Sequence, residues 1–453
     1  MAKKQIFGTD GIRTTANVYP LTPESAVLIG KAITNWFYKK NPSKRITAAI
    51  GTDTRISSEM LNSAVSAGIM AAGGNVINLG VVSTPLVSDF VRTNGCDFGI
   101  VISASHNPFD DNGIKIFNAR GEKLNDEEEI EIEEILFKNS AENIVGDKIG
   151  TLKNAGNPTY EYVARIVKYF ESLKNCSFKV CIDCANGATA KIAEKIFCSF
   201  EKMEKFFFFT APDGTNINDN CGALHPENLA PKILEHKCIA GFAYDGDGDR
   251  LITIDELGRV VDGDKIIGII AKYLNKNGRL AKNTATVTVM SNAGLEKHLA
   301  NCGISLERTN VGDRYLVERI NEKGLSLAGE NSGHLIIKEI NPTGDGIVAS
   351  LMILKILAES GRKLSELADE IKLFPQIQTK VRIKGEKTPI EEIPGLCELI
   401  KSQETLLDGG RMLVRYSGTE PVMRIMAEGP DSVKVRNAVD KAADFVKTFY
   451  GDK

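Results

Sequence analysis

Short apolar runs alternate with helix-length segments along most of the chain. The strand-like runs are residues 48–51, 75–79, 98–102, 178–182, 206–210, 286–290 and 304–308. An alternation of strands and helices predicts parallel or mixed sheets covered by helices. We therefore expect three similar α/β units. Beyond Pro375 the pattern changes to that of a smaller α+β unit.

The length of the chain agrees with this organisation. Because 453 residues exceed what one hydrophobic core usually supports, several domains are expected. Polar or proline-interrupted stretches at 150–158, 255–263 and 372–376 are the candidate junctions. The predicted domains are residues 1–153, 154–256, 257–372 and 373–453.

Two local patterns favour structural interpretations. Residues 126–134 interleave isoleucines with glutamates, which predicts a solvated helix capped by Asn125 or Asp126. The phenylalanines at 206–209 predict a buried strand.

The composition is that of a soluble globular protein, with 56 basic and 59 acidic residues and a net charge of -3. Such a balance offers no excess of cations to neutralise nucleic acid or an anionic membrane. No apolar run reaches the roughly 18 residues of a membrane span, and the first residues lack a secretory pattern. Nine scattered cysteines suit reduced thiols, and the isolated pair Cys181 and Cys184 favours a buried strand over zinc or redox chemistry. We expect a cytoplasmic protein.

A Ser-His-Asn-Pro string directly follows the strand-like run 98–102. In α/β sheets the carboxyl ends of parallel strands open into the ligand crevice, so Ser105 and His106 are well placed for chemistry. A hydrogen-bonded turn is the structural alternative. A serine-hydrolase triad is disfavoured, because the Gly-x-Ser-x-Gly elbow is missing and His106 adjoins Ser105 in sequence.

Three aspartates alternate with glycines at Asp245, Asp247 and Asp249, between two apolar runs. Carboxylates at alternate positions on a glycine-relaxed backbone can converge on one hard cation. An EF-hand is the competing interpretation, with Glu256 at its twelfth position, but Arg250 stands where that loop needs glycine. We therefore favour magnesium shared with phosphate oxygens.

Two further polar loops could bind a substrate. Residues 329–334 place Glu, Ser and His in a glycine-flanked loop that could hydrogen-bond sugar hydroxyls. In the second loop, Arg415 and Arg424 bracket a Ser-Gly-Thr turn that could surround a phosphate dianion. A solvated turn is the alternative for each.

These four strings occur in the order and approximate spacing of the α-D-phosphohexomutase superfamily, which the chain resembles from end to end. That superfamily has a phosphoserine loop, a metal loop, a sugar-recognition loop and a phosphate-binding loop, one in each of four domains around a central cleft. Within it, residues 7–13, 105–109 and 213–227 resemble the bacterial phosphoglucosamine mutase subfamily. Thr14 and Asn331 depart from that subfamily, which usually has Gly and Gln there.

The resemblance implies that Ser105 carries a phosphate, and that an oxygen of this phosphate joins the three aspartates around Mg²⁺. The further catalytic residues that it implies are Arg13 and Arg250, which would steady the phosphoserine, and Lys115 and His106 as candidates for proton transfer. The implied sugar-binding residues are Glu330, Asn331, Ser332 and His334. The implied phosphate-binding residues are Arg415, Ser417, Gly418, Thr419 and Arg424.

The implied reaction interconverts glucosamine 6-phosphate and glucosamine 1-phosphate, through a hexosamine bisphosphate that is both intermediate and activator. It would feed amino-sugar nucleotide and cell-wall precursor synthesis. A phosphoglucomutase or phosphomannomutase acting on neutral hexose phosphates is the alternative, which Asn331 keeps open. A metal-dependent sugar phosphatase and a non-catalytic sensor are the alternatives from other classes. The oligomeric state is open, with a homodimer among the options.

Overall fold

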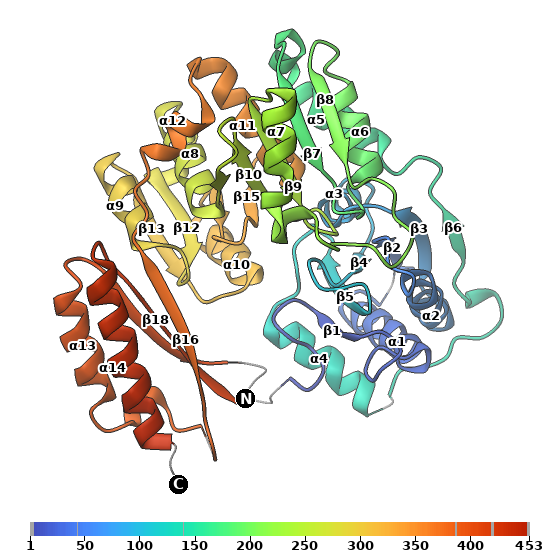
Figure 1. Cartoon of the computed structure of the whole chain (residues 1–453). Helices are drawn as coiled ribbons and strands as arrows, with labels where there is room; N and C mark the ends of the chain where they lie inside the picture. The colour runs from blue at the N-terminus through green and yellow to red at the C-terminus, as the bar shows by residue number, and fades with distance from the viewer. Residues whose placement is uncertain (1–3, 43, 139, 386, 418–420, 451–453) are drawn as a thin grey trace. The chain divides into compact units, whose positions relative to one another are not determined.

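The computed structural model describes residues 4–42, 44–138, 140–385, 387–417 and 421–450. It divides into two compact units. The first comprises residues 1–290 and 306–368, and the second comprises residues 291–305 and 369–453. Within the described residues, three α/β sheets belong to the first unit and an antiparallel sheet to the second (Figure 1). The predicted fold class is confirmed.

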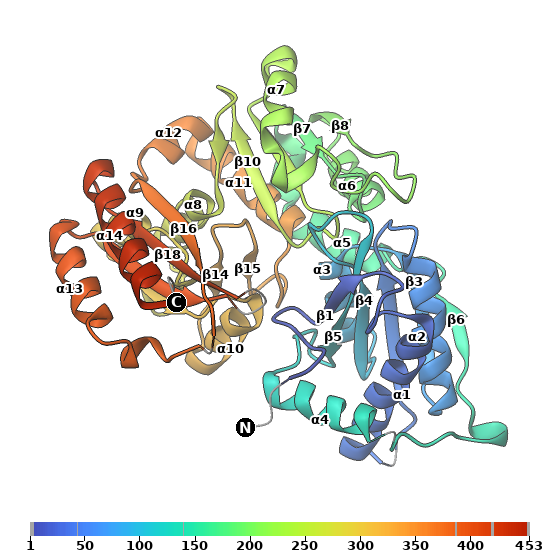
Figure 2. The same ribbon diagram turned by 60° about the horizontal axis from the view of Figure 1, so that its bottom comes forward.

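The first sheet has the strand order β1-β5-β4-β2-β3-β6. Its strands are β1 (Ile12–Thr15), β2 (Thr47–Thr52), β3 (Asn75–Val81), β4 (Phe98–Ile102), β5 (Asp111–Asn118) and β6 (Leu152–Asn154). Its helices are α1 (Pro23–Lys40), α2 (Ser58–Ala71), α3 (Thr84–Thr93) and α4 (Asp126–Phe137). Helices α1 and α2 lie along one face of the sheet (Figure 2), while α3 packs its valines against Gly51 and Gly99 on the other. Strand β5 runs antiparallel to β4, so the chain reverses at the loop that carries Ser105.

Helix α4 begins with the predicted cap, because Asn125 Oδ1 accepts the N–H of Glu128 and the Glu128 side chain accepts the N–H of Asn125. The prediction of a solvated helix is wrong for one face. Glu129 and Glu133 are buried there. Glu133 accepts backbone N–H groups from residues 5–7, and Glu129 pairs with Lys4. These carboxylates are buried because the N-terminal segment supplies their partners.

The second sheet has the order β11-β10-β9-β7-β8. Its strands are β7 (Lys179–Asp183), β8 (Glu204–Phe208), β9 (Ala240–Tyr244), β10 (Leu251–Asp255) and β11 (Val260–Val261). Its helices are α5 (Tyr160–Tyr169), α6 (Ala190–Cys198) and α7 (Ala230–His236). The prediction that the phenylalanines form a buried strand is wrong, because β8 is the edge strand and its side chains are only half-buried. Cys181 and Cys184 are buried at β7, as predicted.

The third sheet has the order β13-β12-β14-β15. Its strands are β12 (Thr284–Thr288), β13 (Ser305–Thr309), β14 (Leu327–Gly329) and β15 (Leu335–Ile337). The helices of this part are α8 (Gly263–Lys276), α10 (Asp313–Lys323), α11 (Gly346–Ser360) and α12 (Leu364–Asp369). Helix α11 is apolar and almost wholly buried, because it contacts β9 and β10 of the second sheet as well as β15 and α8. It therefore packs against elements of both the second and the third domain.

The second unit forms the antiparallel sheet β16-β18-β17. Its elements are β16 (Gln376–Arg382), β17 (Arg411–Tyr416), β18 (Val422–Glu428), α9 (Ala293–Asn301), α13 (Leu396–Leu406) and α14 (Ser432–Tyr450). The side-chain amide of Asn292 donates to and accepts from the backbone of Phe374, which ties the segment before α9 to this unit. Among the helices in the described residues, none is long and apolar enough to cross a membrane.

Candidate active site

The Ser105 loop connects β4 to β5. Ser105 is buried and has a φ of +53°, a left-handed conformation that costs a non-glycine residue about 1–3 kcal/mol. Its backbone N–H donates to Ser103 Oγ at 2.9 Å, and its hydroxyl donates to Asp245 Oδ2 at 2.5 Å. His106 Nδ1 lies 3.4 Å from the same hydroxyl. The strained backbone thus directs the Ser105 oxygen towards the aspartates.

The aspartate loop is the turn between β9 and β10, so the two apolar runs that flank it are antiparallel strands. Asp245, Asp247 and Asp249 are buried, and one carboxylate oxygen from each lies within 4.8 Å of the others. Oδ1 of Asp247 and Oδ1 of Asp249 have no hydrogen-bond partner in the described part of the chain. Burial, and then Asp249 and Asp247, raise the pKa of Asp245 well above its usual range. Converging, partly unsatisfied carboxylates fit one divalent cation.

The EF-hand alternative is wrong, because Glu256 accepts hydrogen bonds from Ser365 at the start of α12 instead of turning towards the aspartates.

Gly246 explains how the aspartate loop can lie so close to Ser105. A Cβ at this position would lie 2.7 Å from the Ser105 carbonyl oxygen and 2.7 Å from a methyl group of Ile217. The two loops can approach each other because this residue lacks a side chain.

Lys115 on β5 is the central cation of the site. Its Nζ lies 2.8 Å from Asp247 Oδ2, 3.3 Å from Asp249 Oδ2 and 3.2 Å from Asp10 Oδ2. Burial would lower the pKa of Lys115, but these three carboxylates outweigh it and raise the pKa well above its usual value. The ammonium group therefore stays protonated and can act as a proton donor, not as a base.

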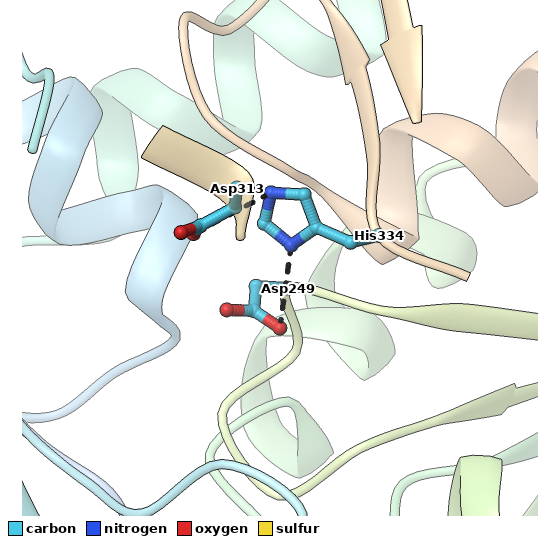
Figure 3. Close-up of side chains that lie close together, drawn as sticks. All are labelled: Asp249, Asp313 and His334. Atoms are coloured by element: carbon cyan, nitrogen blue, oxygen red, sulfur yellow. Dashed lines mark ion pairs between the residues drawn. The ribbon is translucent and has the colours of Figure 1, made fainter. Parts of the chain in front are cut away.

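A ring of alternating charges continues from Lys115. Asp10 pairs with Lys115 and with Lys123, and Lys123 also pairs with Asp313 at the start of α10. Figure 3 shows the His334 imidazole between Asp313 and Asp249, with Nε2 3.8 Å from Asp313 Oδ2 and Nδ1 3.7 Å from Asp249 Oδ1. Burial would lower the pKa of His334, but Asp249 and Asp313 outweigh it and raise the pKa. The ring closes at Asp249 and connects all three α/β domains.

Arg13 and Arg250 are the two arginines whose charges act on His106 of the serine loop. Arg13 pairs with Asp10 at 2.5 Å. Arg250 is half-buried, and its Nε has no hydrogen-bond partner in the described residues. This Nε lies 4.0 Å from Asp249 Oδ1. Burial, and then Arg250 and Arg13, lower the pKa of His106 to about 4. The imidazole of His106 is therefore neutral near pH 7, while the arginines provide positive charge for an anionic group.

The predicted sugar loop is the turn between β14 and β15. Ser332 Oγ donates to Glu330 Oε2 at 3.0 Å, and Glu330 Oε1 has no hydrogen-bond partner in the described residues. Asn331 accepts the Gly263 N–H through its backbone carbonyl. His334 forms an isolated β-bridge with Arg250, so this turn adjoins the aspartate loop.

The predicted phosphate loop lies in the second unit. Arg415 on β17 and Arg424 on β18 are directly paired across the sheet. Burial, and then Arg424, lower the pKa of Arg415. Ser417 accepts a hydrogen bond from Lys387 Nζ through its carbonyl at 2.7 Å. Gly418 and Thr419 lie outside the described residues. The structure brings the other predicted groups together in the first unit, from Ser105 to His334.

Sequence reasoning missed several charged residues of the site. Asp10, Lys123 and Asp313 complete the ring, and Arg55 lies under the serine loop. Asp10 lies within residues 7–13, which resemble the phosphoglucosamine mutase subfamily, so this resemblance could have indicated Asp10 as a site residue. Lys123 and Asp313 are 190 positions apart, and no local pattern links them.

Family models of the phosphoglucomutase/phosphomannomutase type match nearly the whole chain. The alpha/beta/alpha domains I, II and III match residues 4–143, 160–258 and 262–374, and the C-terminal domain matches residues 379–445. The chain belongs to this family, within the α-D-phosphohexomutase superfamily. The predicted domain boundaries after residues 153, 256 and 372 stay predictions.

Its curated relatives are more specific. The phosphoglucosamine mutase of Streptococcus agalactiae serotype III is 43% identical over 98% of this chain and 99% of its own length. That of Brevibacillus brevis is 41% identical over 97% and 98%, respectively. Among solved structures, a phosphoglucomutase/phosphomannomutase family protein from Burkholderia thailandensis has a TM-score of 0.79 at 23% identity, covering 98% of this chain and 97% of that one. An N-acetylphosphoglucosamine mutase from Aspergillus fumigatus, in complex with GlcNAc-6P and magnesium, has a TM-score of 0.70 at 17% identity, covering 99% and 96%. These two structural likenesses show the fold alone.

Proposed function

We propose that this enzyme, an isomerase, interconverts glucosamine 6-phosphate and glucosamine 1-phosphate through a phosphate carried on Ser105. The observation that carries the proposal is the contact between Ser105 Oγ and Asp245 Oδ2, at 2.5 Å, in a buried loop with an unusual backbone conformation. Relatives named phosphoglucosamine mutase at 41–43% identity support the amino-sugar substrate. We also propose a cytoplasmic location, with no nucleic-acid or membrane partner, on the basis of the near-neutral charge.

The residues present fit a magnesium ion. Asp245, Asp247 and Asp249 would hold it together with an oxygen on Ser105, since their carboxylates converge and two of their oxygens have no hydrogen-bond partner in the described residues. When bound, the ion would offset negative charge on the phosphoryl group.

Protein side chains would transfer the protons and stabilise the charge of the transferring phosphate. In the forward step, the bond between phosphorus and Ser105 Oγ breaks and a bond to the free sugar hydroxyl forms. His106, which is neutral, is our candidate to accept the hydroxyl proton, and protonated Lys115 is our candidate to return a proton to Ser105 Oγ. Arg13 and Arg250 would stabilise the charge on the transferring phosphate.

The sugar must present both of its positions to one serine. We propose that the unsatisfied Oε1 of Glu330 accepts hydrogen bonds from sugar hydroxyls, next to Asn331 and Ser332. The phosphate that is not reacting would bind the second-unit loop of Arg415, Ser417, Gly418, Thr419 and Arg424. The hexosamine bisphosphate formed by the first transfer would reverse its orientation in the site before the second transfer. Added bisphosphate would activate an unphosphorylated enzyme by phosphorylating Ser105.

A comparison of substrates tests this proposal. Coupled assays with glucosamine 6-phosphate, glucose 1-phosphate and mannose 1-phosphate should give the highest kcat/KM for the amino sugar. Higher kcat/KM for a neutral hexose phosphate would favour the alternative substrate class, and stoichiometric release of inorganic phosphate would favour a phosphatase.

A further inference from the structure

Arg55 is a buried cation that directs its side chain at the Ser105 loop. It lies just after β2, and its side chain is fully inaccessible to solvent. The guanidinium donates to the backbone carbonyl of Ser105 at 3.1 Å, of Asn107 at 2.8 Å and of Asp111 at 2.9 Å, and also to that of Pro108. A planar guanidinium can contact several carbonyls at once, whereas a lysine ammonium cannot reach them in this geometry.

Asp53, the ion-pair partner of Arg55, is connected to Ser105 through Ser103. Arg55 Nε pairs with Asp53 Oδ2 at 2.8 Å, and the same carboxylate oxygen accepts from Ser103 Oγ at 2.6 Å. Ser103 Oγ in turn accepts the backbone N–H of Ser105. The buried ion pair is therefore connected both to the N–H and to the carbonyl of Ser105.

Asn218, from the second domain, also binds the backbone of the Ser105 loop. Asn218 Nδ2 donates to the carbonyl of Ser105 at 2.9 Å and to that of Asn107 at 3.1 Å. These are two of the carbonyls that Arg55 binds from the first domain. Asn218 is buried and itself has a φ of +59°, so its own backbone is held in a restricted conformation.

We infer that Arg55 and Asn218 are positioning residues for the phosphoryl transfer, acting through the backbone of the Ser105 loop. This inference rests on the proposed role of Ser105. Together they hold the left-handed backbone that brings the Ser105 oxygen to Asp245. A serine that must give a phosphate to one position of the sugar and take one from another needs the same location in both half-reactions. Both side chains bind the backbone of the loop and not the sugar or the phosphate, so we expect their loss to lower kcat and leave KM unchanged.

The experiment compares two variants with matched controls. Arg55→Lys keeps the charge beside Asp53 and loses the fork of donors. Asn218→Gly removes the amide but still permits a positive φ. The control for the first is Arg92→Lys, because Arg92 is exposed on helix α3 and pairs with Asp89 at 2.8 Å, away from the Ser105 loop. The control for the second is Asn220→Gly, because Asn220 is exposed and has a φ of +51°.

We expect Arg55→Lys to lower kcat about 100-fold and Asn218→Gly about 10-fold or more, since small displacements of a reacting group have effects of this size. The KM for glucosamine 6-phosphate should stay within about threefold, and the controls should match the unmodified enzyme. Circular dichroism should show folded protein in each case. Intact mass should show slower loading of the Ser105 phosphate from added glucose 1,6-bisphosphate in the two variants.

The outcomes separate this inference from the proposed function. An inactive unmodified enzyme that never gains a phosphate contradicts the role of Ser105 itself. An active unmodified enzyme with unchanged kcat in both variants overturns the positioning role alone, as does a rise in KM at constant kcat. If Arg55→Lys does not fold, Asn218→Gly decides by the same criteria. If neither variant folds, the residues are structural and the inference is overturned.

Discussion

Replacing Lys123 by Met removes a buried cation that two carboxylates share. Lys123 Nζ pairs with Asp10 and with Asp313, and its side chain is only 7% exposed. Met has a similar length without the charge, so the change leaves the buried Asp313 and the half-buried Asp10 without this partner. Breaking a buried ion pair in this way costs about 3–5 kcal/mol, and we expect the free energy of unfolding to fall by this amount at pH 7.

The loss should depend on pH in a defined direction. Burial would raise the pKa of Asp10, but Lys115, Lys123 and Arg13 outweigh it and hold the pKa well below 3.8 in the folded protein. Asp10 therefore contributes stability that is present above pH about 4 and is lost as the pH falls through the folded pKa. Without Lys123 this contribution shrinks, so the difference between variant and unmodified enzyme should stay constant from pH 7 to about pH 4 and decrease as the pH falls further.

Urea denaturation followed by circular dichroism at pH 7, 5 and 3 measures this dependence. Lys138→Met is the matched control, because Lys138 pairs with Glu134 at 2.9 Å on the surface and should leave stability nearly unchanged. A Lys123→Met protein as stable as the control at pH 7, or one whose deficit grows as the pH falls, would refute the charge ring as a stabilising element.

Three further predictions concern the site itself. Ser105→Ala should abolish turnover in the coupled assay and leave the circular dichroism spectrum unchanged, and full activity would contradict the relay. Gly246→Ala places a Cβ 2.7 Å from the Ser105 carbonyl oxygen, so kcat should fall and the free energy of unfolding should drop by about 1–3 kcal/mol. Gly156→Ala is the control, because a Cβ at position 156 has no atom within 4 Å and should change neither quantity. Removal of divalent cations by EDTA should abolish activity, and added Mg²⁺ should restore it. Asp247→Asn should need a higher Mg²⁺ concentration for half-maximal activity. Unchanged activity after EDTA treatment would exclude a catalytic role for a divalent cation.

The sequence allowed the main parts of the fold and site to be predicted, because their signals are local. The strand before Ser105 and the hairpin around Asp245, Asp247 and Asp249 both show in short stretches of apolar and polar residues. The order of the four loops then indicated the family. The antiparallel pairing of β5 was not evident, since periodicity does not give strand direction.

The residues that sequence reasoning missed depend on contacts between distant segments. No local pattern singles out Arg55, because its partners are Asp53 and the backbone of the Ser105 loop, about 50 positions further along the chain. Glu129 and Glu133 read as solvated, but the N-terminal segment and Arg314 bury them. A charge can be buried wherever a partner arrives from elsewhere in the chain, and one sequence does not reveal that partner.

In the reaction that we propose, phosphate passes from Ser105 to the sugar. Enzyme carrying a radiolabelled phosphate on Ser105 should be mixed with excess glucosamine 6-phosphate and quenched within one turnover. We predict that the label appears in the sugar bisphosphate and then in glucosamine monophosphate, with only traces of inorganic phosphate. Label that stays on the protein during turnover, or leaves as inorganic phosphate in proportion to the enzyme, would contradict this transfer.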